Sequence, residues 1–237
     1  MQKRISVILA ELKNHAPFTL LGALTGIILM LLLRNIQNEI SRRMFCVFHP
    51  AHVVLSAMVT TSLFRLHSPR KHLVIMILVG YFGSIGIATL SDILIPHIGA
   101  HLFGLDIPTE AQIHQIGHAQ PAQKDTEHTA EHHLHKIHFG FIEEWYLVNP
   151  AAFLGIVIAY FIPRSKFPHA GHILISTWAS ATYLLMDMEF QISLASAASV
   201  FITLFISVWL PCCFSDIVFP MLFIKQPSCL SHAHKYI

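Results

Sequence analysis

Six long runs of apolar residues dominate the sequence and constrain what the chain can fold into. A helix needs about 20 predominantly apolar residues to cross the hydrocarbon core of a bilayer, and several runs approach or exceed this length without showing a polar face. Charged residues make up only 12% of the chain, against about 25% in a soluble domain. The sequence therefore predicts an all-α integral membrane protein with six transmembrane helices. The runs are approximately 18–33, 44–64, 73–103, 150–162, 169–186 and 192–224.

The positions of Lys and Arg predict how the chain is oriented. Ten of the fifteen lie on one side of the predicted helices, in segments 1–17, 65–72, 164–168 and 225–237. Because cytoplasmic loops carry the excess of Lys and Arg, we expect a multi-pass protein of the cell (inner) membrane with both termini cytoplasmic. The polar, His-rich segment 105–146 would then lie outside. The expected partner is the lipid bilayer; a net charge of +2 gives no reason to expect nucleic acid, and a homodimer is compatible with the sequence.

Two of the runs contain the same pattern of polar residues at an offset of 120. HPAHVVLSAMVTTSLF begins at His49, and HAGHILISTWASATYL begins at His169. Histidine and serine are uncommon in membrane spans, so their agreement is more informative than that of the aliphatic residues. The further matches within these two stretches are His52 with His172 and Ser56 with Ser176.

A second pattern recurs at an offset of 124, as SDILIP in run three and SDIVFP in run six. The residues that match are Ser91, Asp92 and Pro96 with Ser215, Asp216 and Pro220. Runs one and four agree more weakly, through Pro17, Leu21 and Gly22 with Pro150, Leu154 and Gly155. All these matches occur in the same order along the chain, which indicates a duplication of three spans.

An odd number of spans per repeat makes the second repeat enter the membrane from the opposite side. Inverted repeats of this kind are typical of secondary transporters, whose substrate site lies at the repeat interface beside discontinuous helices. Pro96 and Pro220 remove a backbone donor and disturb the turn before them, so we expect runs three and six to be discontinuous around Asp92 and Asp216. The predicted divisions are 1–17 (amphipathic lead-in), 18–104 (first repeat), 105–146 (polar loop), 147–224 (second repeat) and 225–237 (tail).

The recurring polar residues are suited to binding a metal ion. Histidines three apart share one helix face, and imidazole with carboxylate suits Zn²⁺, Fe²⁺, Mn²⁺, Ni²⁺ or Co²⁺. The predicted ligands are His49, His52, Asp92, His169, His172 and Asp216, supported by Ser56, Ser91, Ser176 and Ser215. Cys212 and Cys213 precede Asp216, but Ala88 and Thr89 stand at the corresponding positions of the first repeat, so the cysteines rank below the histidines.

The polar loop and the end of run three contain a second set of histidines with helical spacing. Tracts of this composition bind metals loosely, and the alternative is a solvated, pH-sensitive linker. We expect this set to capture or sense metal ions outside the membrane. Its members are His97, His101, His114, His118, His128, His132, His135 and His138.

The sequence therefore predicts a transporter of a divalent transition-metal ion that is not an enzyme and binds no nucleotide. One alternative is a membrane-embedded non-haem iron oxidase or hydroxylase, favoured by the many HxxxH and HxxH spacings. A haem-binding membrane subunit, with histidines from two spans as axial ligands, is another. A proton-coupled carrier of an organic solute is the third, because His and Asp inside a membrane can also relay protons. For any single membrane histidine, a hydrogen bond to a neighbouring helix is an equal alternative to metal binding.

Overall fold

The computed structural model describes residues 2–33, 38–67, 73–105, 140–163, 166–187 and 193–214, and all regular structure within these ranges is helical. The histidines predicted in the loop at 114–138, and the second SDIVFP pattern at 215–220, lie outside the described residues. The helices are α1 (Gln2–Leu33), α2 (Asn38–His67), α3 (Leu73–Thr89), the π-helical turn η1 (Leu90–Leu94), α4 (Ile95–Leu102), α6 (Gly140–Glu143), α7 (Trp145–Phe161), α8 (Lys166–Asp187) and α9 (Leu194–Cys213).

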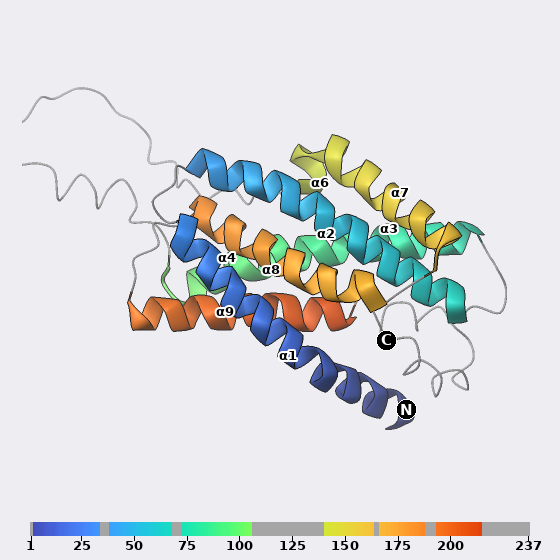
Figure 1. Ribbon diagram of the computed structural model, residues 1–237, viewed down its shortest axis with the longest axis horizontal. Coiled ribbons are helices and arrows are strands. Elements are labelled where there is room, and N and C mark those ends of the chain that lie inside the picture. Colours follow the sequence, from blue (N-terminus) through green and yellow to red (C-terminus); the bar gives the residue numbers. More distant parts are fainter. Residues whose placement is uncertain are drawn as a thin grey trace, which may run out of the picture.

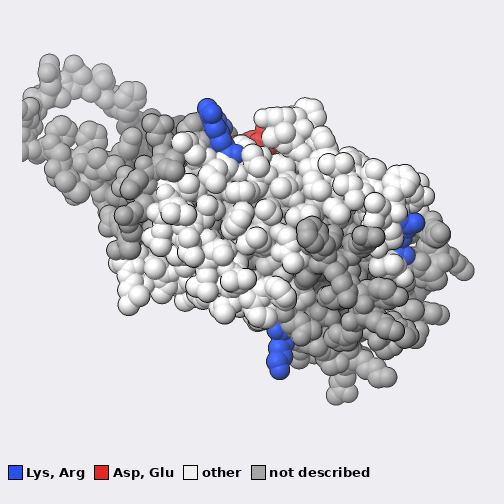
Figure 2. Space-filling model, in the orientation of Figure 1, with Lys and Arg blue, Asp and Glu red and all other residues white. Residues whose placement is uncertain are grey.

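Four of the described helices are long and apolar enough to cross a membrane, within His15–Leu33, Ile40–Leu66, Leu73–Leu102 and Leu194–Cys212. The apolar helix α7 is shorter, at 17 residues. Large apolar side chains are exposed along these helices, including Leu32, Val74 and Phe161, and the described surface in Figure 2 shows very few charged residues. The apolar exterior is what a helix bundle needs in contact with lipid, and we treat the protein as a membrane protein.

The helices alternate in direction along the bundle. In Figure 1, α1, the α3–η1–α4 segment and α8 run one way, and α2, α7 and α9 run the other. The helices α2 and α8 pack against each other; α1 packs on α8 and α9, and α7 packs on α2 and α3. The outer helices α1 and α7 therefore each pack against two helices from the other half of the chain.

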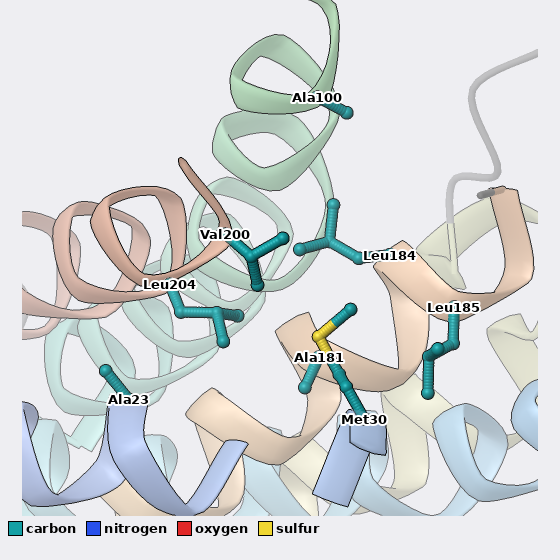
Figure 3. Close-up of a cluster of buried hydrophobic side chains, with 8 residues drawn as sticks. All are labelled: Ala23, Met30, Ala100, Ala181, Leu184, Leu185, Val200 and Leu204. Atoms are coloured by element: carbon teal, nitrogen blue, oxygen red, sulfur yellow. The ribbon is translucent and has the colours of Figure 1, made fainter. Parts of the chain in front are cut away.

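The two largest apolar clusters among the described residues join these helices. The larger, in Figure 3, brings together α1, α4, α8 and α9 through Ala23, Met30, Ala100, Ala181, Leu184, Leu185, Val200 and Leu204. The other joins α2, α3 and α7 through Val53, Ala88, Val148, Ala151 and Ala152. Small residues at these contacts let the helix backbones approach closely. In lipid the hydrophobic effect does not drive helices together, so membrane helices depend on such close packing.

Two glycines mark the closest helix contacts. A Cβ added at Gly22 in α1 would lie 2.7 Å from Oγ1 of Thr177 in α8. A Cβ added at Gly155 in α7 would lie 2.7 Å from Cβ of Ala57 in α2 and closer still to the Val54 carbonyl. Each glycine is therefore required by the packing of an outer helix on a central one.

The chain does not unwind at Pro96, where the sequence predicted a discontinuous helix. It makes a π-helical turn over Leu90–Leu94 instead, in which the backbone N–H of Ile95 donates to the carbonyl of Leu90. Proline at the second position of α4 leaves the carbonyl four residues earlier without its usual donor, and the wider π turn accommodates this change. Single π turns of this kind occur frequently at functional sites, and this one contains Asp92.

Candidate metal site

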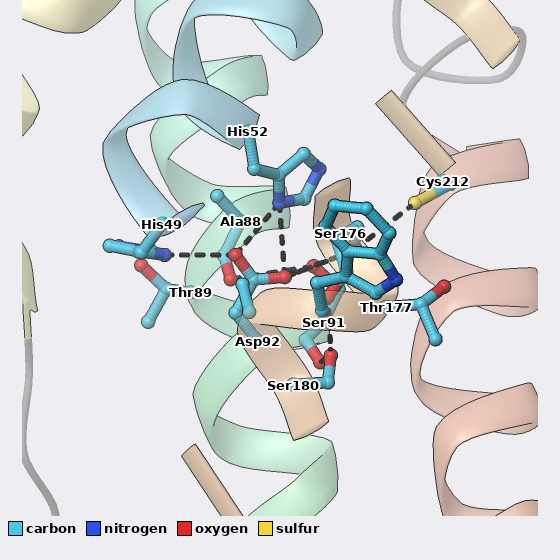
Figure 4. Close-up of polar contacts among 12 residues, drawn as sticks. His49, His52, Ala88, Thr89, Ser91, Asp92, Ser176, Thr177, Ser180 and Cys212 are labelled. Atoms are coloured by element: carbon cyan, nitrogen blue, oxygen red, sulfur yellow. Dashed lines mark hydrogen bonds and ion pairs between the residues drawn. The ribbon is translucent and has the colours of Figure 1, made fainter. Parts of the chain in front are cut away.

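Two histidines of α2 converge on one aspartate of η1 in the interior of the bundle. His49 and His52 are three residues apart, so they share the helix face that packs against η1 and α8. Nδ1 of His49 lies 2.9 Å from Oδ2 of Asp92, and Nδ1 of His52 lies 2.8 Å from the same oxygen (Figure 4). All three side chains are at most 1% exposed. A carboxylate in an apolar run is costly unless it is hydrogen-bonded, and this one is enclosed by donors.

Hydroxyl groups complete the surroundings of the carboxylate. Ser91 donates to Oδ1 of Asp92 at 2.7 Å, and Ser176 of α8 donates to the same oxygen at 2.9 Å. Ser180, one turn beyond Ser176, donates to the backbone carbonyl of Ser91 at 3.0 Å and so joins α8 to the π turn. A buried carboxylate is tolerated when hydrogen bonds replace its hydration, and here they come from three separate elements.

These contacts also orient the two imidazole rings. A carboxylate only accepts hydrogen bonds, so the Nδ1 atoms of His49 and His52 carry the hydrogens and their Nε2 atoms present lone pairs when the rings are neutral. Both Nε2 atoms are buried and have no hydrogen-bond partner within the described part of the chain. Metal-binding histidines usually donate their other ring hydrogen to a carboxylate. The arrangement therefore holds the two rings in an orientation in which their Nε2 atoms could bind a metal ion.

His172 of α8 and Cys212 of α9 lie on the other side of His52. One ligand atom from each of His52, His172 and Cys212 lies within 4.8 Å of the others, and all three side chains are buried. The rings of His52 and His172 are stacked, with centroids 4.8 Å apart and an interplanar angle of 17°. Imidazole and thiolate are both ligands that zinc accepts, and a site with three protein ligands leaves the fourth position of a tetrahedral ion open.

The present ring geometry is not yet that of a bound ion. Tetrahedral coordination with Zn–N distances near 2.0–2.1 Å and Zn–S near 2.3 Å brings ligand atoms to about 3.4–3.6 Å from one another. In addition, the lone pair of an imidazole nitrogen lies in the ring plane, so near-parallel rings do not direct their lone pairs to one point. Binding one ion through His52, His172 and Cys212 therefore requires a ring rotation and an approach of about 1 Å.

Most of the predicted ligands in the described residues meet at one place. His49, His52, Asp92 and His172 are together, with Ser91 and Ser176 in contact with Asp92. Ser56 is fully buried one turn beyond His52, and its hydroxyl has no hydrogen-bond partner in the structure as described. His97 and His101 contact each other on α4, apart from this group.

Other predicted ligands cannot be placed. His169 lies in the first turn of α8, but its side chain is outside the described part. Asp216, Ser215, Pro220 and the loop histidines His114, His118, His128, His132, His135 and His138 also lie outside it. The roles predicted for these residues stay predictions.

The structure brings two further residues to the site: Cys212, which the sequence analysis ranks below the histidines, and Ser180, which it does not identify. Cys212 lies four residues before Asp216, so the helical period places both residues on the same helix face. The sequence analysis ranks Cys212 low because Ala88 stands at the corresponding position of the first repeat. That ranking assumes that both repeats contribute identical ligands. Ser180 follows His172 and Ser176 at the same four-residue spacing.

Comparison with protein-family models, curated proteins and solved structures gives no match. The chemistry of the site is therefore inferred from its own residues. A buried carboxylate, three imidazoles and a thiol can hold a transition-metal cation or exchange protons, since each of these groups can change its charge or donate a lone pair.

Proposed function

We propose that this protein carries a divalent transition-metal ion across the membrane and that the ion binds between α2, η1, α8 and α9. The observation that supports this most is the dual role of Asp92, which holds Nδ1 of both His49 and His52. Their Nε2 atoms are buried in the interior and have no hydrogen-bond partner among the described residues. Such polar groups are costly inside a bundle, and ionisable residues inside a membrane usually belong to a substrate or ion pathway.

The types of ligand at the site favour some of the candidate metals Zn²⁺, Fe²⁺, Mn²⁺, Ni²⁺ and Co²⁺ over others. Imidazole suits Zn²⁺, Ni²⁺ and Fe²⁺, thiolate suits zinc, and Mn²⁺ prefers oxygen ligands. Cys212 beside His52 and His172 therefore favours Zn²⁺ over Mn²⁺ as the transported ion. The negative charge of Asp92 would offset part of the charge of the cation in the low-dielectric interior.

We further propose that the chain is an inverted repeat of six spans, with α7 and α8 as the fourth and fifth. The neighbours of the helices support this: α1 packs on α8 and α9, just as α7 packs on α2 and α3. The glycine contacts support it independently. Gly22 and Gly155 occupy matching positions, and they meet Thr177 and Ala57, which differ by the same offset of 120 that relates His172 to His52.

Buried hydroxyl groups extend from the central histidines and suggest a path for the ion. On α2, Ser56 and Thr60 follow His52 at four-residue intervals, and on α8, Ser176 and Ser180 follow His172 in the same way; all are fully buried. Because α2 and α8 run in opposite directions (Figure 1), the two rows extend toward opposite ends of the bundle. A polar row on each side of a central site is what alternating access would use.

The test is metal uptake into liposomes that contain purified protein and a Zn²⁺-sensitive dye. We expect the variant with His52→Gln and His172→Gln to lose uptake, because both imidazoles would be gone while side-chain size is nearly kept. The matched control is His15→Gln, which replaces a buried histidine of α1 outside the site and should retain uptake. Uptake at the wild-type rate by the double variant would contradict the proposal.

The hydrogen bonds of Asp92 also favour a second candidate, a proton-coupled carrier of an organic solute. Asp92 bridges His49 and His52 through short contacts, and such a chain can pass a proton between rings. Proton flux through metal-free protein distinguishes the two candidates. If the protein is a carrier of an organic solute, a pH gradient should drive proton flux when that solute is present. A metal transporter should show no such flux without metal. Saturable Zn²⁺ uptake without any solute favours metal transport.

A further inference from the structure

A second pair of histidines lies on α4, away from the central site. His97 and His101 are four residues apart, so they face the same side of the helix. Their Nε2 atoms are 3.1 Å from each other, their ring centroids are 4.5 Å apart, and the planes are tilted by 76°. His101 is exposed and His97 is half-buried. Both lie in the last two turns of Leu73–Leu102, a 30-residue apolar segment that is longer than the roughly 20 residues needed to cross the hydrocarbon core. We therefore infer that the pair stands at the membrane surface, where an ion from solution can reach it.

We propose that His97 and His101 form a second transition-metal site, a two-imidazole chelate at the surface. Two nitrogens bound to one tetrahedral zinc ion at 2.0–2.1 Å lie about 3.4 Å apart, and the observed Nε2–Nε2 distance is within a few tenths of an ångström of this value. In the present contact one Nε2 atom carries the hydrogen and the other accepts it. A metal ion takes the place of that shared hydrogen, so little movement of the rings is required.

The second nitrogen of His97 is also in a position typical of a metal ligand. Its Nδ1 atom lies 3.5 Å from the hydroxyl group of Tyr183 on α8, a side chain that is 1% exposed. Metal-binding histidines usually have a partner at the nitrogen that does not bind the metal, and this partner fixes the ring and its tautomer. Tyr183 can serve in this way at the long limit of hydrogen bonding.

An apolar layer separates this pair from the central site. The ring of Tyr183 lies 5.7 Å from that of Phe45, and Phe45 stacks on His49 with centroids 5.1 Å apart. Phe45, Tyr183 and Ile93 form one buried cluster with exposed fractions of at most 1%. Because this cluster fills the space between His97 and His49, the surface pair can bind an ion while the central residues do not. The surface site therefore stands whether or not the central one transports metal.

The chemistry of the pair selects the class of ion. Neutral imidazole binds divalent first-row metals in the order that peaks at Cu²⁺, with Ni²⁺ and Zn²⁺ close behind, and Ca²⁺ and Mg²⁺ prefer oxygen ligands. We therefore expect Zn²⁺, Ni²⁺ and Cu²⁺ to bind at His97 and His101, and Ca²⁺ and Mg²⁺ not to bind.

The test is a calorimetric Zn²⁺ titration of the full-length protein in detergent. The loop histidines would compete for the ion, so the background variant carries Asn in place of the seven of them: His114, His118, His128, His132, His133, His135 and His138. On this background, His101→Ala should remove one binding event or weaken it by roughly 100-fold, the order of gain expected when a second ligand acts intramolecularly. An unchanged stoichiometry and affinity would overturn the proposal.

A control variant keeps the number of histidines and changes only their spacing. Leu102 is 77% exposed, so the combination of His101→Ala with Leu102→His is expected to fold. Residues five apart on a helix do not share a face, so this variant should bind as weakly as His101→Ala, whereas wild-type binding in it would also overturn the proposal. The variant with His52→Gln and His172→Gln should keep the surface site. If that variant loses no binding event while His101→Ala does, the central proposal fails and this one stands.

Discussion

Nδ1 of His52 lies 2.8 Å from Oδ2 of Asp92, and neither side chain is exposed to solvent. The contact joins α2 to the π turn within the bundle, and it leaves Nε2 of His52 as the nitrogen that has no hydrogen-bond partner among the described residues. The two oxygens of Asp92 accept four hydrogen-bond donors: His49, His52, Ser91 and Ser176. Under the proposed function, Asp92 would therefore act on an ion through the histidines that it orients.

Replacing this carboxylate should weaken metal binding without removing any imidazole. In Asp92→Asn, the amide can accept from only one side and no longer holds both histidine rings, so we expect Zn²⁺ affinity and uptake to fall by about 10–100-fold, the usual effect of losing a group that orients a metal ligand. Calorimetry and liposome uptake measure the two quantities. Glu143→Gln, which replaces an exposed carboxylate of α6, is the control and should change neither. Wild-type affinity in Asp92→Asn would show that the orienting contact is unimportant.

The glycines at the helix contacts give a prediction about stability. A methyl group at Gly155 meets the backbone of Val54 and Cβ of Ala57, neither of which can rotate away, whereas a methyl group at Gly22 meets the side chain of Thr177. We expect both Gly22→Ala and Gly155→Ala to destabilise, by about 1–3 kcal/mol as for other overpacked sites, with Gly155→Ala the more severe. The measurement is the midpoint of unfolding in a denaturing detergent.

Gly86 provides the matched control for this experiment. It lies in α3, and a Cβ added there meets nothing within 4 Å. Replacement of a helical glycine by alanine at an unobstructed position stabilises by about 0.4–1 kcal/mol because the unfolded chain loses freedom. Gly86→Ala should therefore be neutral or stabilising. A similar loss of stability in all three variants would mean that helix packing at Gly22 and Gly155 is not the cause.

The polar residues in apolar runs made part of this site predictable from sequence. His49, His52, Asp92 and His172 were identified because such residues are costly in a membrane, and the structure brings them together. The helix period could not predict that Asp92 would sit in a π turn, since a π turn depends on how the chain accommodates Pro96 in its surroundings. The repeat also could not show that one half of the chain contributes a ligand that the other half lacks. Ala88 is the counterpart of Cys212, so the symmetry argued against the thiol that lies beside His52 and His172.

The thiol of Cys212 should determine which metals the central site prefers. In Cys212→Ser, a hydroxyl replaces the soft sulfur ligand, and we expect Zn²⁺ affinity to fall by roughly 10–100-fold, with a much smaller change for Mn²⁺, which prefers oxygen. Competition of the two ions for uptake measures this preference. Cys46→Ser is the control, because Cys46 hydrogen-bonds to Glu144 at 2.8 Å and lies outside the central group. An equal loss for both metals would argue that Cys212 supports packing and does not bind the ion.

The equivalent serines of the two central helices should behave in opposite ways when each is replaced by alanine. Ser176 donates to Oδ1 of Asp92 at 2.9 Å, so Ser176→Ala removes a bond to a buried charge and should lower the free energy of unfolding by about 1.5–3 kcal/mol. The hydroxyl of Ser56 is buried without a hydrogen-bond partner within the described part of the chain. Removing such an unsatisfied group should leave stability unchanged or raise it slightly.

Zn²⁺ uptake by the Ser56→Ala variant tests whether the row of hydroxyl groups on α2 conducts the ion or only supports the fold. If the hydroxyl row on α2 conducts the ion, Ser56→Ala should reduce Zn²⁺ uptake severalfold although the protein is as stable as the wild type. The reason is that an ion that has lost its hydration water would also lose an oxygen contact one turn beyond His52. Thermal unfolding and liposome uptake of the same preparation provide both values. A stable Ser56→Ala variant with full uptake would remove this row from the proposed path, and the ion would then have to leave the central histidines by another face of α2.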